Sequence, residues 1–210
     1  MKLLHVDASA KREWSNSRAL SRYFIDLLQA QQADLEIDYL DLTTATPAHV
    51  DEAFTIATYT PQAERTPVMQ QALQASDALC ARLLAADAFV FAMPMYNFSM
   101  PSVFKAFIDN IVRTDVTYRK AADGSYQGMM AAEKVLFITT RGADLRAGSP
   151  LAGMDGLTPS LRAAFGFIGV REPHFVDAQP LTFAEAEQRE AALVRAKQDL
   201  AQVAQQWGRA

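Results

Sequence analysis

Short apolar segments alternate with longer amphipathic segments along most of this 210-residue chain. The short segments are rich in branched and aromatic residues, which favours β-strands, whereas the longer ones repeat apolar positions at helical spacing. Strands are expected at residues 3–7, 35–40, 88–93, 134–140 and 174–177. Helices are expected at residues 17–31, 67–85, 101–112, 158–167 and 183–207. This alternation predicts repeated strand-helix-strand units around a parallel α/β sheet.

All the expected strands except the second are mostly apolar on both faces, as strands covered by helices on two sides must be. Residues 41–66 and 115–128 have no regular pattern and are interpreted as excursions at the sheet edge, where substrate contacts are expected. The chain contains no internal repeat and no linker-like segment. A single domain spanning residues 1–210 is therefore expected.

Composition narrows the functional classes. The net charge of −4 argues against a general nucleic-acid binder, which needs a surplus of Lys and Arg. No apolar run of membrane-spanning length and no leader pattern is present, which predicts a cytoplasmic protein without membrane association. The single cysteine, Cys80, cannot form an internal disulfide, and its helical spacing from Leu73 and Leu84 predicts core packing.

The loop after the first strand is rich in hydroxyl side chains. Ser9 and Ser15 lie in this loop, and Ser17 lies at the start of the next expected helix. Hydroxyls, the first N–H groups of a helix and the helix dipole all favour a phosphate dianion. Neither a Walker loop nor a GxGxxG fingerprint is present. The loop therefore predicts a monophosphate site, with simple helix capping by Ser15 or Ser17 as the alternative.

The loop after the third strand combines apolar, aromatic and amide side chains in the run Met-Pro-Met-Tyr-Asn-Phe-Ser-Met-Pro at 93–101. Asn97 can donate and accept, which suits the alternating carbonyl and N–H edge of a pyrimidine-like ring. The first and third strands of a doubly wound sheet flank the point where strand order reverses, so both loops are expected to share one site. A core Tyr and Phe beside a turn-forming Asn is the alternative.

The fourth strand ends in Thr139, Thr140, Arg141 and Gly142 at the same edge of the expected sheet. Gly142 permits close approach of the backbone to a ring, and the hydroxyls and Arg141 would support negative charge on it. An ordinary turn with a solvated arginine has the same sequence pattern. This segment is therefore a weaker indication of a ligand site than the first two loops.

Other chemistry finds little support in the sequence. His5 lies inside an apolar strand and is expected in the core, while His49 and His174 have no neighbours at metal-ligand spacing. No metal is expected. No Ser, His and Asp set has a nucleophile signature, so hydrolysis, including hydrolysis of a phosphodiester, lacks evident machinery.

On these residues, the chain resembles the FMN-dependent NADH-azoreductases, a branch of the flavodoxin-like NAD(P)H:quinone oxidoreductases. The Met-Pro-Met-Tyr-Asn-Phe run at 93–98 is the most discriminating part. The other parts are Ser9 with Ser15-Asn16-Ser17, Ala92, residues 139–142, and Phe-Gly-Phe-Ile-Gly at 165–169. The resemblance implies a flavodoxin-like three-layer sandwich with a five-stranded parallel sheet in the order 2-1-3-4-5 and helices on both faces.

The resemblance also implies bound FMN and a set of binding residues. The implied FMN contacts are Ser9, Ser15, Asn16, Ser17, Pro94, Met95, Tyr96, Asn97, Phe98, Thr139, Thr140, Arg141 and Gly142. The implied substrate contacts are Tyr96, Phe98, Lys120 and Phe165. Two positions depart from the family pattern: Ala143 stands where familiar members have a glycine, and Lys120 lies where they often have an aromatic residue. Both departures bear on substrate preference.

The activity implied by the resemblance is reduction of quinones and aromatic azo compounds. NADH or NADPH would deliver a hydride through FMN in a ping-pong sequence that needs no catalytic side chain. Family members are homodimers in which the partner subunit completes the pocket. An FMN electron carrier of the flavodoxin type, without a small-molecule substrate, is the alternative. The excursions at 41–66 and 115–128 favour the enzyme.

Overall fold

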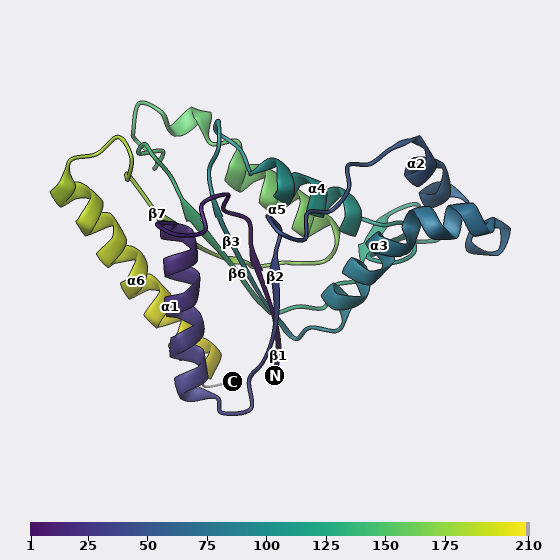
Figure 1. Cartoon of the computed structure of the whole chain (residues 1–210), viewed down its shortest axis with the longest axis horizontal. Helices are drawn as coiled ribbons and strands as arrows, with labels where there is room; N and C mark the ends of the chain where they lie inside the picture. Colours follow the sequence, from purple (N-terminus) through teal and green to yellow (C-terminus); the bar gives the residue numbers. More distant parts are fainter. Residues whose placement is uncertain (209–210) are drawn as a thin grey trace.

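A parallel sheet of five strands forms the middle layer of the computed structural model, which describes residues 1–208 (Figure 1). The strands are β1 (Lys2–Asp7), β2 (Glu36–Asp41), β3 (Ala88–Pro94), β6 (Lys134–Thr140) and β7 (His174–Ala178). Their order is β2-β1-β3-β6-β7, and every neighbouring pair is parallel. Numbering only the strands of this sheet turns that order into 2-1-3-4-5, which confirms the predicted topology.

Helices cover both faces of the sheet (Figure 1). One face carries α1 (Asn16–Gln31) and α6 (Ala186–Gly208), and the other carries α3 (Pro67–Leu84), α4 (Ser102–Ile111) and α5 (Leu157–Phe167). Each layer of helices packs an apolar stripe on the sheet, as the sequence periodicity predicts. Phe91 lies at the centre of the α4–α5 side, with its ring centroid 4.8 Å from that of Phe165 and 5.2 Å from that of Phe137.

The two irregular segments contain more structure than their patterns indicate. Residues 41–66 include α2 (Glu52–Tyr59) and a short 3-10 helix, η1 (Gln62–Glu64), while β4 (Tyr118–Lys120) and β5 (Tyr126–Gly128) pair as an antiparallel hairpin. Helix α2 buries only Ala57 and Thr58, so it has no long apolar stripe to detect in the sequence. No helix within residues 1–208 has the length and apolarity needed to cross a bilayer.

The structure confirms the predicted burial of three residues and corrects one core position and one helix boundary. Cys80, Leu73 and His5 are buried, as expected. Leu84, however, is exposed, and its neighbour Leu83 occupies the core position beside Cys80. The last helix begins at Ala186 instead of residue 183, because residues 181–184 fold back in turns against the loop after β6.

The loops that follow β1, β3 and β6 begin side by side at one edge of the sheet. The Ala8 N–H donates to the Ala92 carbonyl at 2.9 Å, and the Met95 N–H donates to the Thr140 carbonyl at 2.8 Å. These bonds extend the parallel pairing one step past the strands. Three segments that are far apart in the sequence therefore enter their loops from adjacent positions.

Candidate functional site

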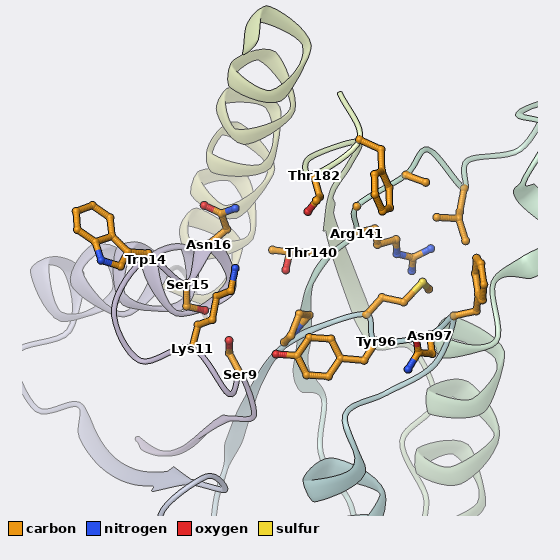
Figure 2. Close-up of a pocket in the computed structure, with 17 residues that line it drawn as sticks. Ser9, Lys11, Trp14, Ser15, Asn16, Tyr96, Asn97, Thr140, Arg141 and Thr182 are labelled. Carbon is orange, nitrogen blue, oxygen red and sulfur yellow. The ribbon is translucent and has the colours of Figure 1, made fainter. Parts of the chain in front are cut away.

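Three loops at the carboxyl ends of β1, β3 and β6 enclose a pocket of about 540 Å³ (Figure 2). This volume lies within the range of small-molecule sites, which is roughly 300–1,000 Å³. Most of the predicted cofactor contacts line it: Ser9, Ser15, Asn16, Pro94, Met95, Tyr96, Asn97, Phe98, Thr140, Arg141 and Gly142. Figure 2 shows Ser9, Lys11 and Ser15 on one wall, with Tyr96 and Asn97 on the opposite wall.

The wall formed by the β1 loop ends at the start of α1. Ser15 is the N-cap of this helix, and its Oγ accepts a hydrogen bond from the Arg18 N–H at 3.4 Å. The N–H groups of Asn16 and Ser17 lie in the first turn, where a helix offers no acceptor. No other partner for them occurs within residues 1–208. Ser15 therefore caps the helix, as the alternative interpretation predicts, while the Asn16 and Ser17 N–H groups keep no protein partner within residues 1–208.

The opposite wall is a tight turn at the tip of the β3 loop. Tyr96 and Ser99 exchange backbone hydrogen bonds of 2.9 and 3.0 Å, while Asn97 and Phe98 between them have φ angles of 48° and 66°. Two successive positive φ values are the geometry of a type I′ turn. Asn tolerates this conformation, whereas for Phe it costs on the order of 1–3 kcal/mol. The Tyr96–Ser99 backbone bonds hold Phe98 in this strained conformation.

The turn after β6 contributes its backbone more than its charge. The Arg141 guanidinium is buried and donates to the Asp155 carboxylate at 2.8 Å and to the Thr158 hydroxyl at 2.6 Å. Burial by itself would raise the pKa of Asp155, but hydrogen bonds from the Thr158 backbone and Arg141 outweigh it and lower that pKa. The Arg141 charge is therefore already compensated inside the protein. Gly142 also lines the pocket, and its carbonyl accepts hydrogen bonds from the Leu181 and Phe183 N–H groups.

Comparison with known proteins agrees with this geometry. A family model described as a flavodoxin-like fold matches residues 1–204. FMN-dependent NADH:quinone oxidoreductase 1 from Trichormus variabilis is 44% identical over 207 residues, which cover 99% of this chain and 97% of that protein. The chain belongs to the flavodoxin-like family of FMN-dependent NADH:quinone oxidoreductases. The resemblance inferred from the sequence is thus confirmed.

Other members and solved structures extend this family match. The FMN-dependent NADH:quinone oxidoreductase of Nostoc punctiforme is 39% identical and is covered over 98% of both chains. An azoreductase from Bacillus anthracis superposes with a TM-score of 0.88 at 21% identity, over 97% of this chain and 98% of that one. An FMN-dependent NADH-azoreductase from the same species, solved with FMN, gives 0.83 at 20% identity, over 97% and 99%. These structures show the shared fold.

Four residues predicted as contacts in this family member lie outside the pocket. Ser17 and Thr139 are fully buried behind its walls, and the Thr139 hydroxyl bonds to Asp177. Phe165 is 1% exposed and packs in the aromatic core. Lys120 lies on the β4–β5 hairpin, in strand β4.

Sequence reasoning missed several residues that line the pocket of this family member: Lys11, Trp14, Ala143, Leu145, Thr182 and Phe183. Lys11 was detectable, because it is a cation inside the hydroxyl-rich loop. The Lys11 side chain lies beside Ser15, whereas Trp14 contributes to the lining although its ring is directed outward and the residue is 92% exposed (Figure 2). Phe183 was not detectable, because it reaches the pocket only through the fold-back of residues 181–184, where its N–H donates to the Gly142 carbonyl at 3.0 Å.

A partly buried polar network, in which Tyr39 is 49% exposed, lies beneath the β1 loop of this family member. The Arg18 Nη2 donates to Asp41 Oδ1 at 2.8 Å and to the Ser9 carbonyl at 2.9 Å, while its Nη1 donates to the Tyr39 hydroxyl at 3.1 Å. Burial alone would raise the pKa of Asp41, but hydrogen bonds from Arg18 and Thr43 hold it at about 2. Burial and the nearby carboxylates raise the pKa of Tyr39 to about 12.

Replacing Asp41 with Asn is expected to flatten the loss of stability in acid. Its pKa is about 2 when folded against an ordinary 3.8, so its contribution is complete above about pH 4 and is lost as the pH falls toward 2. Linkage sets this contribution at about 2 kcal/mol. The D41N variant should therefore be less stable than the wild type near neutral pH, with the difference shrinking in acid, as measured by urea unfolding at a series of pH values.

Asp144→Asn is the matched control for this experiment. The pKa of Asp144 is also about 2, because of its hydrogen bond with Arg146, but both side chains are largely solvated. Solvent screening makes such a pair weak. An acid effect of D144N as large as that of D41N would contradict the assignment to the partly buried network.

Proposed function

We propose that this chain binds FMN in the pocket of Figure 2 and reduces quinones with electrons from NADH or NADPH. The observation that carries the proposal is that one pocket has two different ends: a hydroxyl-rich helix start and an aromatic turn that carries the Asn97 amide. Relatives of 44% and 39% identity, covered almost end to end, carry the name FMN-dependent NADH:quinone oxidoreductase. The names of these relatives and the geometry of the pocket therefore both support FMN as the ligand.

The phosphate of FMN would bind at the start of α1. The hydroxyls of Ser9 and Ser15 and the N–H groups of Asn16 and Ser17 supply donors without a metal ion. The helix dipole and the Lys11 ammonium favour the negative charge. Ser17 would contribute through its backbone, because its side chain is fully buried.

The flavin ring would lie against the backbone of residues 94–98 and the turn at Thr140 and Gly142. Asn97 can pair with the pyrimidine edge of the ring, because its amide both donates and accepts. Tyr96 and Phe98 are 39% and 44% exposed at the pocket, which leaves aromatic surface for stacking of the acceptor. Thr139 would act as a support behind the wall, and Arg141, which lines the pocket, would act as a support within it, since their side chains bond to Asp177 and Asp155.

FMN, when bound, supplies the redox chemistry, which we propose is a ping-pong hydride exchange between the nicotinamide and a quinone or aromatic azo acceptor. The chain's own residues bind the ring, orient it and hold a flat acceptor against it. The Gly142 N–H and the Asn97 amide would supply hydrogen-bond donors to the ring edge. No side chain is required as an acid, since positioning of one planar group against another is the main task.

Exposed apolar side chains support a homodimer as the assembled form. Ile56, Tyr59 and Val68 project from α2 and the start of α3, and Phe98 and Met154 are also exposed. Large exposed apolar side chains mark interaction sites when they gather in one patch. We propose that a second copy covers α2 and the pocket rim, and that Lys120 reaches an acceptor only across that interface. Phe165 is too deeply buried for such contact.

The purified protein is expected to absorb in the near ultraviolet and the blue, and to bleach when NADH is added. It should then consume NADH steadily when menadione is supplied, because an enzyme turns over a small acceptor without a protein partner. Bleaching without steady consumption would instead identify an electron carrier. A colourless protein that takes up no FMN at micromolar concentration would contradict the whole proposal.

Lys11→Gln is expected to weaken FMN binding by about threefold to tenfold, the effect of removing one partly solvated charge from a phosphate. Riboflavin binding should not change, because riboflavin has no phosphate. Fluorescence titration at low and high salt measures both, and the difference between K11Q and wild type should shrink with salt. Arg12→Gln is the control, because Arg12 is exposed on the same loop but does not line the pocket. Equal effects of the two changes would disprove a role specific to Lys11.

Light scattering is expected to give twice the mass of one chain at micromolar concentration. Val68→Glu should shift this mass toward the monomer, because it would bury a charge in the proposed interface. Val194→Glu serves as the control, since Val194 is also exposed but lies on α6, away from this surface. A wild type with the mass of one chain, or dissociation by V194E alone, would rule out the proposed dimer.

A further inference from the structure

Arg18 is a buried cation that lies next to the pocket but does not line it. We propose that Arg18 is a positioning residue for the phosphate end of the site. Its guanidinium holds the Ser9 peptide so that the loop presents donors to the ligand. The proposal rests on the proposed function, because it takes the loop before α1 as the place where the FMN phosphate binds.

The contacts of Arg18 tie three separate segments together. The residue belongs to the first turn of α1, and its Nη2 donates to the Ser9 carbonyl at 2.9 Å, inside the β1 loop. The same nitrogen donates to Asp41 Oδ1 at 2.8 Å, at the end of β2. A planar fork can satisfy both acceptors at once. The edge strand β2 therefore sets the position of a loop to which it is not directly connected.

The bond to Ser9 fixes the direction of one peptide group. A trans peptide points its C=O and its N–H to opposite sides. Because the Ser9 carbonyl points at the Arg18 guanidinium, the following N–H of Ala10 points away from Arg18. The carbonyl oxygen, which would repel a phosphate, is thereby held beneath the loop. Without Arg18 this oxygen would lose its partner, and the peptide would be free to rotate.

The charges around Arg18 also favour a cation at this position. Asp7 and Asp41 both lie beneath the loop, and the Tyr39 hydroxyl donates to Asp7 at 3.0 Å. His5 Nε2 lies 3.3 Å from the other Asp7 oxygen, and the Ser21 hydroxyl donates to it at 3.0 Å. Two carboxylates beside a site for a dianion would weaken binding, because like charges repel. Arg18 is the guanidinium that faces both carboxylates.

Arg18 is buried, but one of its side-chain nitrogens makes no hydrogen bond in the described part of the chain. Its Nε is buried and has no partner within residues 1–208. A buried donor without a partner is unusual and needs an explanation. The two terminal nitrogens bond to Ser9, Asp41 and Tyr39. The orientation that makes these bonds leaves Nε without an acceptor among the described residues.

The test compares FMN and riboflavin affinities in Arg18→Met, which keeps most of the side-chain volume. FMN binding should weaken on the order of 10- to 100-fold, the loss expected for hydrogen bonds involving a charged group. Riboflavin, which lacks the phosphate, should stay within about twofold of the wild type, a change below the size of one such bond. Fluorescence titration gives both affinities, and circular dichroism with thermal melting reports whether the variant is folded. A general loss of packing would weaken both ligands equally and would overturn the proposal.

Arg82→Met is the matched control. Arg82 also forks onto strand β2, where its Nη2 donates to Asp38 Oδ1 at 2.6 Å and to the Tyr39 carbonyl at 3.0 Å, but it does not line the pocket. Its loss should lower stability and leave the ratio of the two affinities unchanged. A reduced ratio in R82M equal to that in R18M would overturn a role specific to Arg18.

The Arg18→Lys variant covers the case in which R18M does not fold. It keeps the positive charge but removes the planar fork that bonds to Ser9 and Asp41 together, so it should lower the ratio of FMN affinity to riboflavin affinity by less than R18M would. An unchanged ratio in R18K, or in a folded R18M, would disprove the positioning role. If the wild type itself binds FMN and riboflavin equally well, the phosphate assignment fails instead, which separates the two hypotheses.

Discussion

Parallel pairing of β1, β3 and β6 is the constraint on which the pocket depends. Parallel strands must all leave the sheet at the same edge, so the loops that follow them begin side by side whatever their separation in the sequence. The bonds from Ala8 to Ala92 and from Met95 to Thr140 carry this pairing into the loops. The core beneath, centred on Phe91, keeps the strands in register. The site is therefore built on rigid elements, with only its lining in loops.

Two local features that cost stability lie at the pocket. Phe98 is held in the left-handed backbone region, and Arg18 leaves one donor without a partner within residues 1–208. Both features lie in or directly behind the walls that we propose contact FMN. Strain and unsatisfied groups persist only where surrounding structure holds them in place. Here the paired turn from Tyr96 to Ser99 and the network around Asp7 supply that support.

The two arginines near the site are buried, whereas Lys11 is exposed, and this difference separates their roles. Arg18 and Arg141 are both buried and bonded to carboxylates, so their charges are largely compensated within the protein. Lys11 is exposed and lines the pocket. A cation that remains partly hydrated can bind and release an anion, whereas a buried paired cation shapes the surrounding backbone. The sequence does not distinguish these two uses of positive charge.

The sequence by itself determined the five strands, the helices that cover them and the three loops at the pocket, because each produces a strong local pattern of apolar spacing or turn residues. It did not reveal α2, which buries only Ala57 and Thr58. It also could not reveal the contact of Phe183 with the pocket, the pairing of Arg141 with Asp155, or the bond from Arg18 to Ser9. Those depend on which side chains face each other after the strands have paired. Only the tertiary structure decides that, because a side chain's partners are set by distance in space and not by position along the chain.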